Sequence, residues 1–353
     1  MFYLKIYSLF LIYAIIAIGC ENKKNAPLQT RSFEFTYNVN IESTEGKKIE
    51  VWIPIPKSNE VQTISELKIQ TDDLAYSIET ETTHNNTYLY INDNNGTFST
   101  KKISVICNVM RKEHENIHFN NVNPKKYLGA YTMVPIGGVF EKIISNNKLS
   151  KTNLRGIYNY VLEGMHYGKP KSVNNKYYQE PWLSPNKKYG MKEVQREDIV
   201  TLYKKAKKNN GNYTFGNGNS IYACDIGVGN CTDYHSYFMS LNRTMEIPTR
   251  FHMGFSIPYE ESGNIGGYHC WADYYIKGEG WYPVDISEAD KAHDKKDYFF
   301  GTVCQNRLEM TVGRDFILKG YENKIANLFI YPIMEIDDKL SDKLNKKFIY
   351  KNL

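Results

Sequence analysis

The 353-residue chain lacks any block of five or more charges of one sign and any internal repeat of useful period. The first absence argues against a nucleic-acid partner, because nucleic-acid-binding proteins cluster their basic residues. The hydrophobic fraction of 41% and the charged fraction of 24% are close to globular averages. They exclude a largely disordered chain, a collagen-like repeat and a polytopic membrane protein. We therefore expect a globular protein of about two domains.

The N-terminus has the features of an export signal. A single charge, Lys5, precedes an apolar run at residues 6–19, which is shorter than the roughly 20 residues that span a bilayer. The run ends in Ala-Ile-Gly before Cys20, and a polar stretch follows, which resembles a bacterial lipoprotein signal. This resemblance implies that residues 1–19 are removed, that Cys20 is lipidated, and that residues 20–31 tether an exported protein to a membrane of the cell envelope. An ordinary signal peptide with an incidental cysteine is the alternative.

Strand-like alternation begins directly after this tether. Apolar residues alternate with polar ones at Phe33, Phe35, Tyr37, Val39 and Ile41. Further strand candidates, separated by polar turns, lie at residues 49–53, 66–70, 75–78, 87–91 and 103–110. This pattern predicts an all-β, sandwich-like N-terminal domain over residues 32–135. Pro54 and Pro56 cut one candidate strand short and indicate a sheet edge, because proline cannot donate to a ladder.

The second half of the chain mixes helical and strand patterns. Helical spacing of apolar residues begins at Leu154 and again at Ile199, and the proline-containing stretch 167–190 between them predicts a loop. Strands are expected at residues 249–255 and 268–276. Residues 277–280 contain glycine and predict a hairpin turn that leads into residues 281–285. The second half is therefore expected to be an α+β domain.

Residues 222–290 contain the side chains that could carry out catalysis. Helical spacing after Cys231 and a stop at Pro248 predict a helix that starts at or next to Cys231. At such a position the free N–H groups and the helix dipole stabilise a thiolate. His269 and Asp285 would lie on neighbouring antiparallel strands. A regular hairpin would pair His269 with about residue 288, so that a bulge or a longer loop would be needed to bring Asp285 opposite.

These three residues are the parts of a nucleophilic triad. Cys231 would attack a carbonyl group as a thiolate. His269 would deprotonate the thiol and later protonate the leaving amine. Asp285 would hold the imidazole in its working tautomer.

Four short blocks carry a family resemblance. They are GNCTDY at 229–234, EIPTR at 246–250, GYHCWA at 267–272 and GWYPVD at 280–285. In this order and rough spacing they resemble the bacterial transglutaminase-like superfamily. The resemblance implies a papain-like α+β catalytic core at residues 150–300, with a Cys–His–Asp triad at Cys231, His269 and Asp285. It also implies a C-terminal extension, residues 301–353, that packs on the core.

The resemblance leaves the oxyanion donors open. Some members use an upstream tryptophan, and no tryptophan occurs between residues 183 and 270. The backbone N–H of Cys231 could supply one donor, and Tyr222 or Asn230 are candidates for the second. No calcium loop of the EF-hand type is present, so neither a metal nor another cofactor is predicted.

Competing interpretations exist for the same residues. His235 lies four residues after Cys231 and is a rival base, or else a packed helix residue. Asp285 could merely cap a turn. Cys224 and Cys270 could form a disulfide or stay packed thiols. A zinc site made of Cys224, Cys231, Cys270 and a histidine lacks the usual C-x₂-C unit.

Taken together, the patterns predict an exported lipoprotein that acts on an amide in a protein or peptide. A thioester on Cys231 would be resolved by an amine or by water. One alternative is a cysteine peptidase or amidase of the same fold that acts on peptide or cell-envelope material. Another is a non-catalytic surface binding lipoprotein. Because the family includes acyl transferases, peptidases and amidases, the fold does not determine the reaction.

Overall fold

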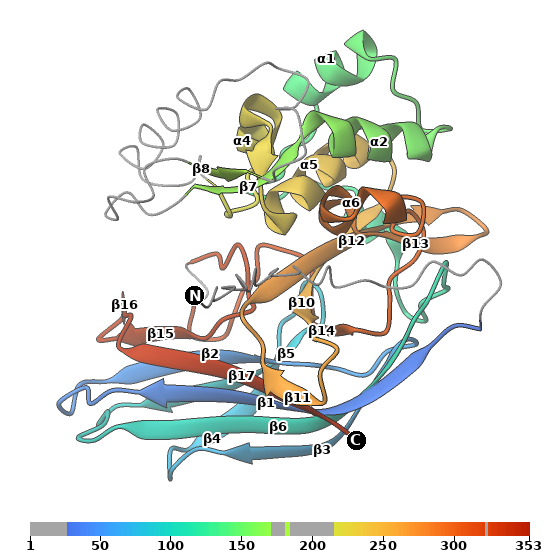
Figure 1. The fold of residues 1–353 in the computed structure, drawn as a ribbon. Helices are drawn as coiled ribbons and strands as arrows, with labels where there is room; N and C mark the ends of the chain where they lie inside the picture. The colour runs from blue at the N-terminus through green and yellow to red at the C-terminus, as the bar shows by residue number, and fades with distance from the viewer. Residues whose placement is uncertain (1–26, 171–180, 184–214, 322–323) are drawn as a thin grey trace, which may run out of the picture.

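The computed structural model describes residues 27–170, 181–183, 215–321 and 324–353 (Figure 1). The export signal and the helix expected near Ile199 lie outside the described residues. The described chain forms a β-sandwich of two sheets, a further sheet above the sandwich, and a layer of helices (Figure 1). No helix among the described residues is long and apolar enough to cross a membrane.

Two five-stranded sheets build the sandwich, in the orders β11-β17-β1-β6-β3 and β16-β15-β2-β5-β4. The N-terminal strands are β1 (Thr30–Ile41), β2 (Ile49–Ile55), β3 (Gln62–Gln70), β4 (Tyr76–Thr80), β5 (Thr87–Asp93) and β6 (Lys101–Lys112). The later strands are β11 (Ser262–Asn264), β15 (Ile333–Ile336), β16 (Lys339–Leu340) and β17 (Leu344–Asn352). The sandwich is therefore not confined to residues 32–135, since strands from the end of the chain complete both of its sheets.

The alternation in β1 holds as predicted. All five apolar residues from Phe33 to Ile41 are 0% exposed. The strand begins at Thr30, two residues inside the segment expected to be a tether. Its partner on one side is β17, in an antiparallel register from Phe33 opposite Asn352 to Ile41 opposite Leu344. The end of the C-terminal extension therefore pairs with the first strand, whereas β14 (Arg307–Val312) of the same extension joins the catalytic sheet, where we expected the whole extension to pack.

The edge expected at Pro54 is only partly present. β2 lies between β15 and β5, so it is an inner strand. Pairing with β15 covers only Ile49 to Trp52, whereas pairing with β5 continues through Pro54 to Ile55. The proline thus follows the point at which one neighbour ends, where no ladder donor is needed.

The catalytic half combines a four-stranded sheet, β13-β12-β10-β14, with helices packed on it. Its strands are β10 (Thr249–Ser256), β12 (Tyr268–Ile276), β13 (Gly280–Val284) and β14 (Arg307–Val312). Its helices are α1 (Val139–Asn146), α2 (Leu154–Gly164), α4 (Ser220–Ile226), α5 (Cys231–Thr244) and α6 (Ile286–Lys291), and 3₁₀ turns occur at η1 (Pro124–Tyr127) and η2 (His293–Lys295). A small sheet joins β7 (His166–Pro170), β8 (Pro181–Leu183) and β9 (Val228–Gly229). The prediction of a loop over residues 167–190 is therefore wrong where β7 and β8 form.

Helix α5 is the centre of this half. The prediction of an amphipathic helix understates its burial, because every residue from Cys231 to Arg243 is buried. Some of its polar side chains are hydrogen-bonded inside the protein: Arg243 donates to the carbonyls of Thr249 and Gly129, and Ser236 donates to the carbonyl of Thr232. A helix enclosed on all sides holds the first residue of its N-terminus in a fixed place.

One apolar core joins the sandwich to the catalytic sheet. The ring of Phe255 on β10 lies 4.4 Å from that of Phe348 on β17 and 5.5 Å from that of Phe35 on β1, between ring centroids. The same core includes Cys231 and Cys270. Packing across both halves therefore supports the position of the sheet that carries the candidate site.

Candidate active site

Cys231 is the first residue of α5, and its neighbours build the helix start. The side chain of Asn230 accepts from the Thr232 N–H at 2.9 Å, while the side chain of Asp233 accepts from the Asn230 N–H at 3.0 Å. This reciprocal capping box satisfies two of the N–H groups that a helix leaves without partners. Among the described residues, the N–H of Cys231 donates to no other group. It therefore points out of the helix start together with the positive end of the dipole.

Asp233 also fixes the loop before the helix. Its carboxylate accepts from the N–H groups of Gly216 and Gly218, at 3.0 and 3.1 Å. A Cβ at Gly229 would lie 2.5 Å from the Cβ of Asp233. The glycine two residues before Cys231 thus makes room for this buried aspartate.

His269 and Asp285 meet as predicted, but by a different route. Nε2 of His269 lies 2.6 Å from Oδ2 of Asp285, and both residues are buried. The hairpin register is regular, with Tyr274 opposite Tyr282, so neither a bulge nor a longer loop is needed. β13 ends at Val284, and Asp285 becomes the N-cap of α6. The chain turns there and brings the carboxylate back toward β12.

The capping role and the triad role of Asp285 coexist on different oxygens. Oδ1 accepts from the N–H of Glu288 and from the hydroxyl of Ser287, both at 3.1 Å. Oδ2 accepts from His269 and from Nη2 of Arg307, the latter at 2.9 Å. The two interpretations drawn from the sequence were therefore not exclusive, because one carboxylate caps a helix and orients a histidine.

Arg307 was not foreseen from the sequence. It lies on β14, is 2% exposed, and reaches Asp285 from a strand 22 residues further along the chain. Burial alone would raise the pKa of Asp285, but the charges of His269 and Arg307 and the hydrogen bond from His269 hold that pKa well below its usual range. Asp285 is therefore a carboxylate at all working pH values. No local motif marks this arginine, since only the pairing of β14 with β10 brings it near.

Two side chains of β12, Cys270 and His269, act on the thiol of Cys231. The interaction with Cys270 lowers the pKa of Cys231 most, burial opposes it, and the interaction with His269 and its charge lower the pKa further, to well below the ordinary range of a thiol. Nε2 of His269 is bound to Asp285, and Nδ1 lies 3.8 Å from Oε1 of Glu288. Nδ1 is therefore the ring nitrogen that could exchange a proton with the thiol.

His269 is the cation of the pair. Burial would lower its pKa, and Arg307 acts in the same direction, but the charge of Asp285 and the hydrogen bonds to Asp285 and Cys231 raise the pKa of His269 to about 9. A thiol with a lowered pKa beside an imidazole with a raised one exists at neutral pH as a thiolate–imidazolium pair. Such a pair is a prepared nucleophile with its proton donor in place.

His235 has a structural role, and its interpretation as a rival base is wrong. Nδ1 lies 2.7 Å from the carbonyl of Cys231, and Nε2 accepts from the N–H of Ile286 at 3.0 Å. Both ring nitrogens are thus engaged with backbone groups, and burial lowers the pKa of this histidine. The neutral ring ties the start of α5 to the start of α6, and so helps to set the position of Cys231 relative to Asp285.

The two candidate side chains for the oxyanion site differ in position. The Asn230 side chain accepts from Thr232 and donates to the hydroxyl of Tyr268 at 3.1 Å, so its amide is already engaged in holding the helix start. Tyr222 lies on the adjacent helix α4 and is 1% exposed. Its part in the site stays a prediction. The N–H of Cys231, at the start of α5, has no hydrogen-bond partner among the described residues and is therefore available as an oxyanion donor.

The sequence left a disulfide and a pair of packed thiols open for Cys224 and Cys270. Both carry thiols in the structure, so the disulfide between them is not formed. Cys270 shares its buried core with Cys231.

Within the described residues, one group of carboxylates could hold a metal ion: Glu50, Glu335 and Asp338. Lys48 lies 2.9 Å from both Glu50 and Asp338, and Lys324 pairs with Glu335. The two ammonium groups already balance two of the three carboxylate charges. It belongs to the sandwich and has no part in the triad.

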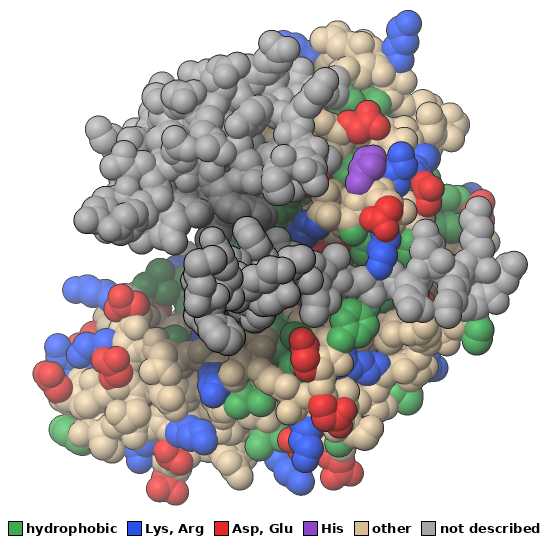
Figure 2. All heavy atoms as spheres, viewed as in Figure 1, with side chains coloured by type: hydrophobic (Ala, Val, Ile, Leu, Met, Phe, Trp, Pro, Cys, Tyr) green, Lys and Arg blue, Asp and Glu red, His purple; other side chains and the backbone are tan. Residues whose placement is uncertain are grey.

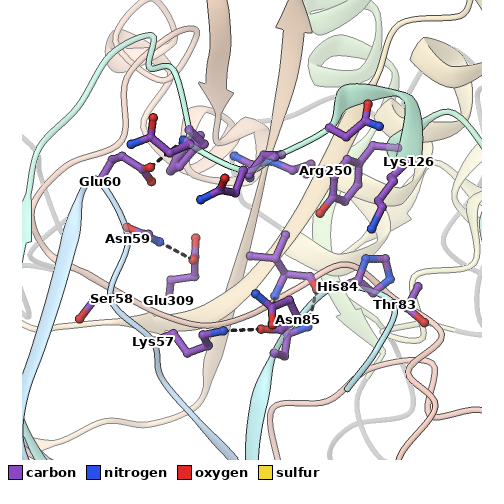
Figure 3. Close-up of a pocket in the computed structure, with 18 of the residues that line it drawn as sticks. Lys57, Ser58, Asn59, Glu60, Thr83, His84, Asn85, Lys126, Arg250 and Glu309 are labelled. Carbon is purple, nitrogen blue, oxygen red and sulfur yellow. Dashed lines mark hydrogen bonds between the residues drawn. The ribbon is translucent and has the colours of Figure 1, made fainter. Parts of the chain in front are cut away.

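A polar pocket of about 350 Å³ lies where loops of the sandwich meet the catalytic sheet (Figure 3). Asn59 and Glu309 lie side by side in its lining and are joined by a hydrogen bond of 2.8 Å, and Arg250 lines it from β10 (Figure 3). Arg250 pairs with Asp273, four residues beyond His269 on β12, which corresponds to about 13 Å along a strand. The pocket is therefore separate from the triad. On the face shown in Figure 2, the charges of both signs are interspersed over the sandwich.

Comparison with known proteins agrees with this site. Residues 186–286 match the model of the transglutaminase-like superfamily, and this range includes all three triad residues. An uncharacterized protein of Haemophilus influenzae is 30% identical over 168 residues, which cover 38% of this chain and 46% of that protein. The chain thus matches about half of that relative's length.

Solved structures show a more distant likeness. A "Putative Cysteine Protease" from Cytophaga hutchinsonii aligns over 92% of this chain and all of its own, with 11% identity and a TM-score of 0.49. The periplasmic domain of TgpA from Pseudomonas aeruginosa aligns over 76% of this chain and 78% of its own, with 12% identity and a TM-score of 0.31.

The matched residues form a domain of the transglutaminase-like superfamily. This confirms the family resemblance seen in the four sequence blocks. The α+β fold class, with strands before the core, is confirmed as well. At the level of the superfamily the match supports a thiol enzyme.

Proposed function

We propose that this protein is a thiol enzyme that cleaves amide bonds through an acyl thioester on Cys231. One observation carries the proposal: Nε2 of His269 lies 2.6 Å from Oδ2 of Asp285, and the same histidine lowers the pKa of Cys231, the first residue of α5. A buried thiol at a helix N-terminus, beside an imidazole held by a carboxylate, has the arrangement that nucleophilic catalysis requires. A purely structural cysteine needs none of these partners.

The geometry supports a two-step reaction. The thiolate of Cys231 attacks the carbonyl carbon, and the developing oxyanion is positioned to accept from the Cys231 N–H. His269, charged at neutral pH, gives its Nδ1 proton to the leaving amine, which leaves the acyl group on sulfur. The neutral imidazole then removes a proton from water or from a second amine, and that nucleophile releases the acyl group. Asp285 stabilises the imidazolium in both steps, and Arg307 keeps Asp285 in place.

The substrate class follows from the chemistry of the site. A thioester route suits an amide of a protein or a peptide, with water giving hydrolysis and a primary amine giving acyl transfer. We further propose that the enzyme works outside the cytoplasm, held at a membrane by lipid on Cys20. This proposal is supported by the short apolar run and the cysteine that follows it, together with the polar residues 21–25.

An acyl-trapping experiment tests the proposed function. The full chain is mixed with a peptidyl p-nitrophenyl ester, and the release of nitrophenol and the mass of the protein are followed together. We expect a burst of nitrophenol and one acyl group on Cys231, which is lost when Cys231 is replaced by Ala and is retained in Cys224→Ser. Addition of a primary amine then separates transfer from hydrolysis by the product formed. An adduct of equal yield in Cys231→Ala would contradict the proposal.

A further inference from the structure

A second thiol lies beside the proposed nucleophile. The sulfur of Cys270 lies 3.6 Å from the hydroxyl oxygen of Thr232, the residue after Cys231, and both cysteines belong to the same buried core. Neither cysteine is in a disulfide. The start of α5 thus lies beside the third residue of β12. A disulfide between the two cysteines requires their sulfur atoms to approach to about 2.05 Å.

The two thiols differ in their surroundings. Cys231 is 3% exposed and lies beside the imidazolium of His269, whereas Cys270 is 0% exposed and lies in the apolar core. Burial raises the pKa of Cys270 well above its usual range. Cys231 is therefore the sulfur that reacts with an oxidant, and Cys270 is a protonated neighbour that the oxidant does not reach.

From this juxtaposition we infer that Cys231 and Cys270 form a reversible disulfide when the protein meets a hydroperoxide, so that Cys270 protects the nucleophile from irreversible oxidation. The thiolate of Cys231 takes one oxygen from the peroxide and becomes a sulfenic acid, and hydroxide or alkoxide leaves. The sulfur of Cys270 then attacks the sulfur of Cys231. Its proton joins the departing hydroxyl group, water is released, and the disulfide forms. Two electrons pass from the two sulfurs to the peroxide.

This inference rests on the thiolate of Cys231 that the proposed function also requires. It adds a modification with a stated consequence, since the disulfide removes the nucleophile and a thiol reductant restores it. Without Cys270, the sulfenic acid would remain open to a second peroxide and pass to the sulfinic acid, which such reductants do not reverse.

Peptide mapping after peroxide treatment tests the inference. Cleavage before Asp225 and Asp233 isolates Cys231 in the peptide 225–232, away from Cys224. In the wild-type protein we expect this peptide to be joined to the peptide that contains Cys270, with the loss of two hydrogen atoms, and to be released by dithiothreitol. In Cys270→Ala we expect the gain of two oxygen atoms on Cys231, which dithiothreitol does not reverse. Cys224→Ser is the matched control and should still form the bridge.

The outcomes separate the two proposals. Gain of two oxygen atoms on Cys231 of the wild-type protein, with Cys270 still open to alkylation after unfolding, would overturn the disulfide alone. This outcome is measured on the wild-type protein, so a variant that fails to fold cannot change the conclusion. A Cys231 that resists both peroxide and iodoacetamide would overturn the disulfide and the proposed function together.

Discussion

Replacement of Asp285 by Asn tests how the site prepares its thiolate. The pKa of His269 is about 9, against an ordinary value of 6.5. At about 1.4 kcal/mol for each tenfold change in proton affinity, this difference corresponds to about 3 kcal/mol of stabilisation of the imidazolium. Burial and Arg307 both act against this charge, and Asp285 supplies most of the opposing stabilisation, with a smaller part from Cys231. Without the carboxylate, the pKa of His269 should fall below 6.5.

The loss of the imidazolium carries over to the nucleophile. At pH 6 the Cys231 thiolate would lose its cationic partner, and its reaction with iodoacetamide should slow by about 100-fold, the factor that corresponds to about 3 kcal/mol. The assay is the alkylation rate of Cys231 at pH 6, followed by mass spectrometry. Equal rates in wild type and Asp285→Asn would refute the reasoning.

A matched variant controls for damage to folding. Asp273 is also buried on β12, and it pairs with Arg250 and with His252, at 2.9 and 3.1 Å. Asp273→Asn therefore removes a comparable buried carboxylate from β12, the strand that carries His269, without changing a residue of the triad. We expect the alkylation rate of Cys231 in this variant to stay within a few-fold of wild type.

Three further predictions concern the same elements. The rate of acylation should fall above about pH 9 as His269 loses its proton, which a pH profile of kcat/KM measures, and a rate that stays constant to pH 11 would exclude this role. Asn230→Ala should remove the cap of α5 and cost about 1 kcal/mol of the free energy of unfolding in urea, while a cost of zero would show that the cap is dispensable. Phe255→Ala should cost about 3–5 kcal/mol in the same measurement, because its ring joins β10 to β1 and β17, and an unchanged midpoint would contradict the shared core.

Local patterns predicted the parts of the site well. The helix at Cys231 and the hairpin near His269 follow from periodicity and from turn residues, which are local signals. The position of Asp285 was less predictable. A regular hairpin register placed Asp285 three residues away from the partner position of His269. The turn that brings Asp285 back toward His269 comes from its role as the N-cap of α6, which a strand pattern does not reveal. Arg307 had no local signal, since it reaches the site only through the pairing of β14 with β10.

The sandwich shows the same limit on a larger scale. The alternation in β1 predicted its buried face residue by residue, because burial on one face of a strand requires a period of two. The pairing of Phe33 with Asn352 joins residues at opposite ends of the chain. β17 itself exposes most of its first half and carries only a weak pattern. Local alternation could therefore identify the first strand but not its partner.

The most direct test of the account is the alkylation of Cys231 at pH 6 in wild type and in His269→Ala, with the Cys224 thiol on the adjacent helix as the reference in the same protein. A thiol with an ordinary pKa of about 8.5 is almost wholly protonated at this pH and reacts slowly. The account predicts that Cys231 reacts much faster than Cys224 in wild type, and that His269→Ala removes the advantage. A Cys231 that reacts no faster than Cys224 in the wild-type protein would contradict the thiolate–imidazolium pair.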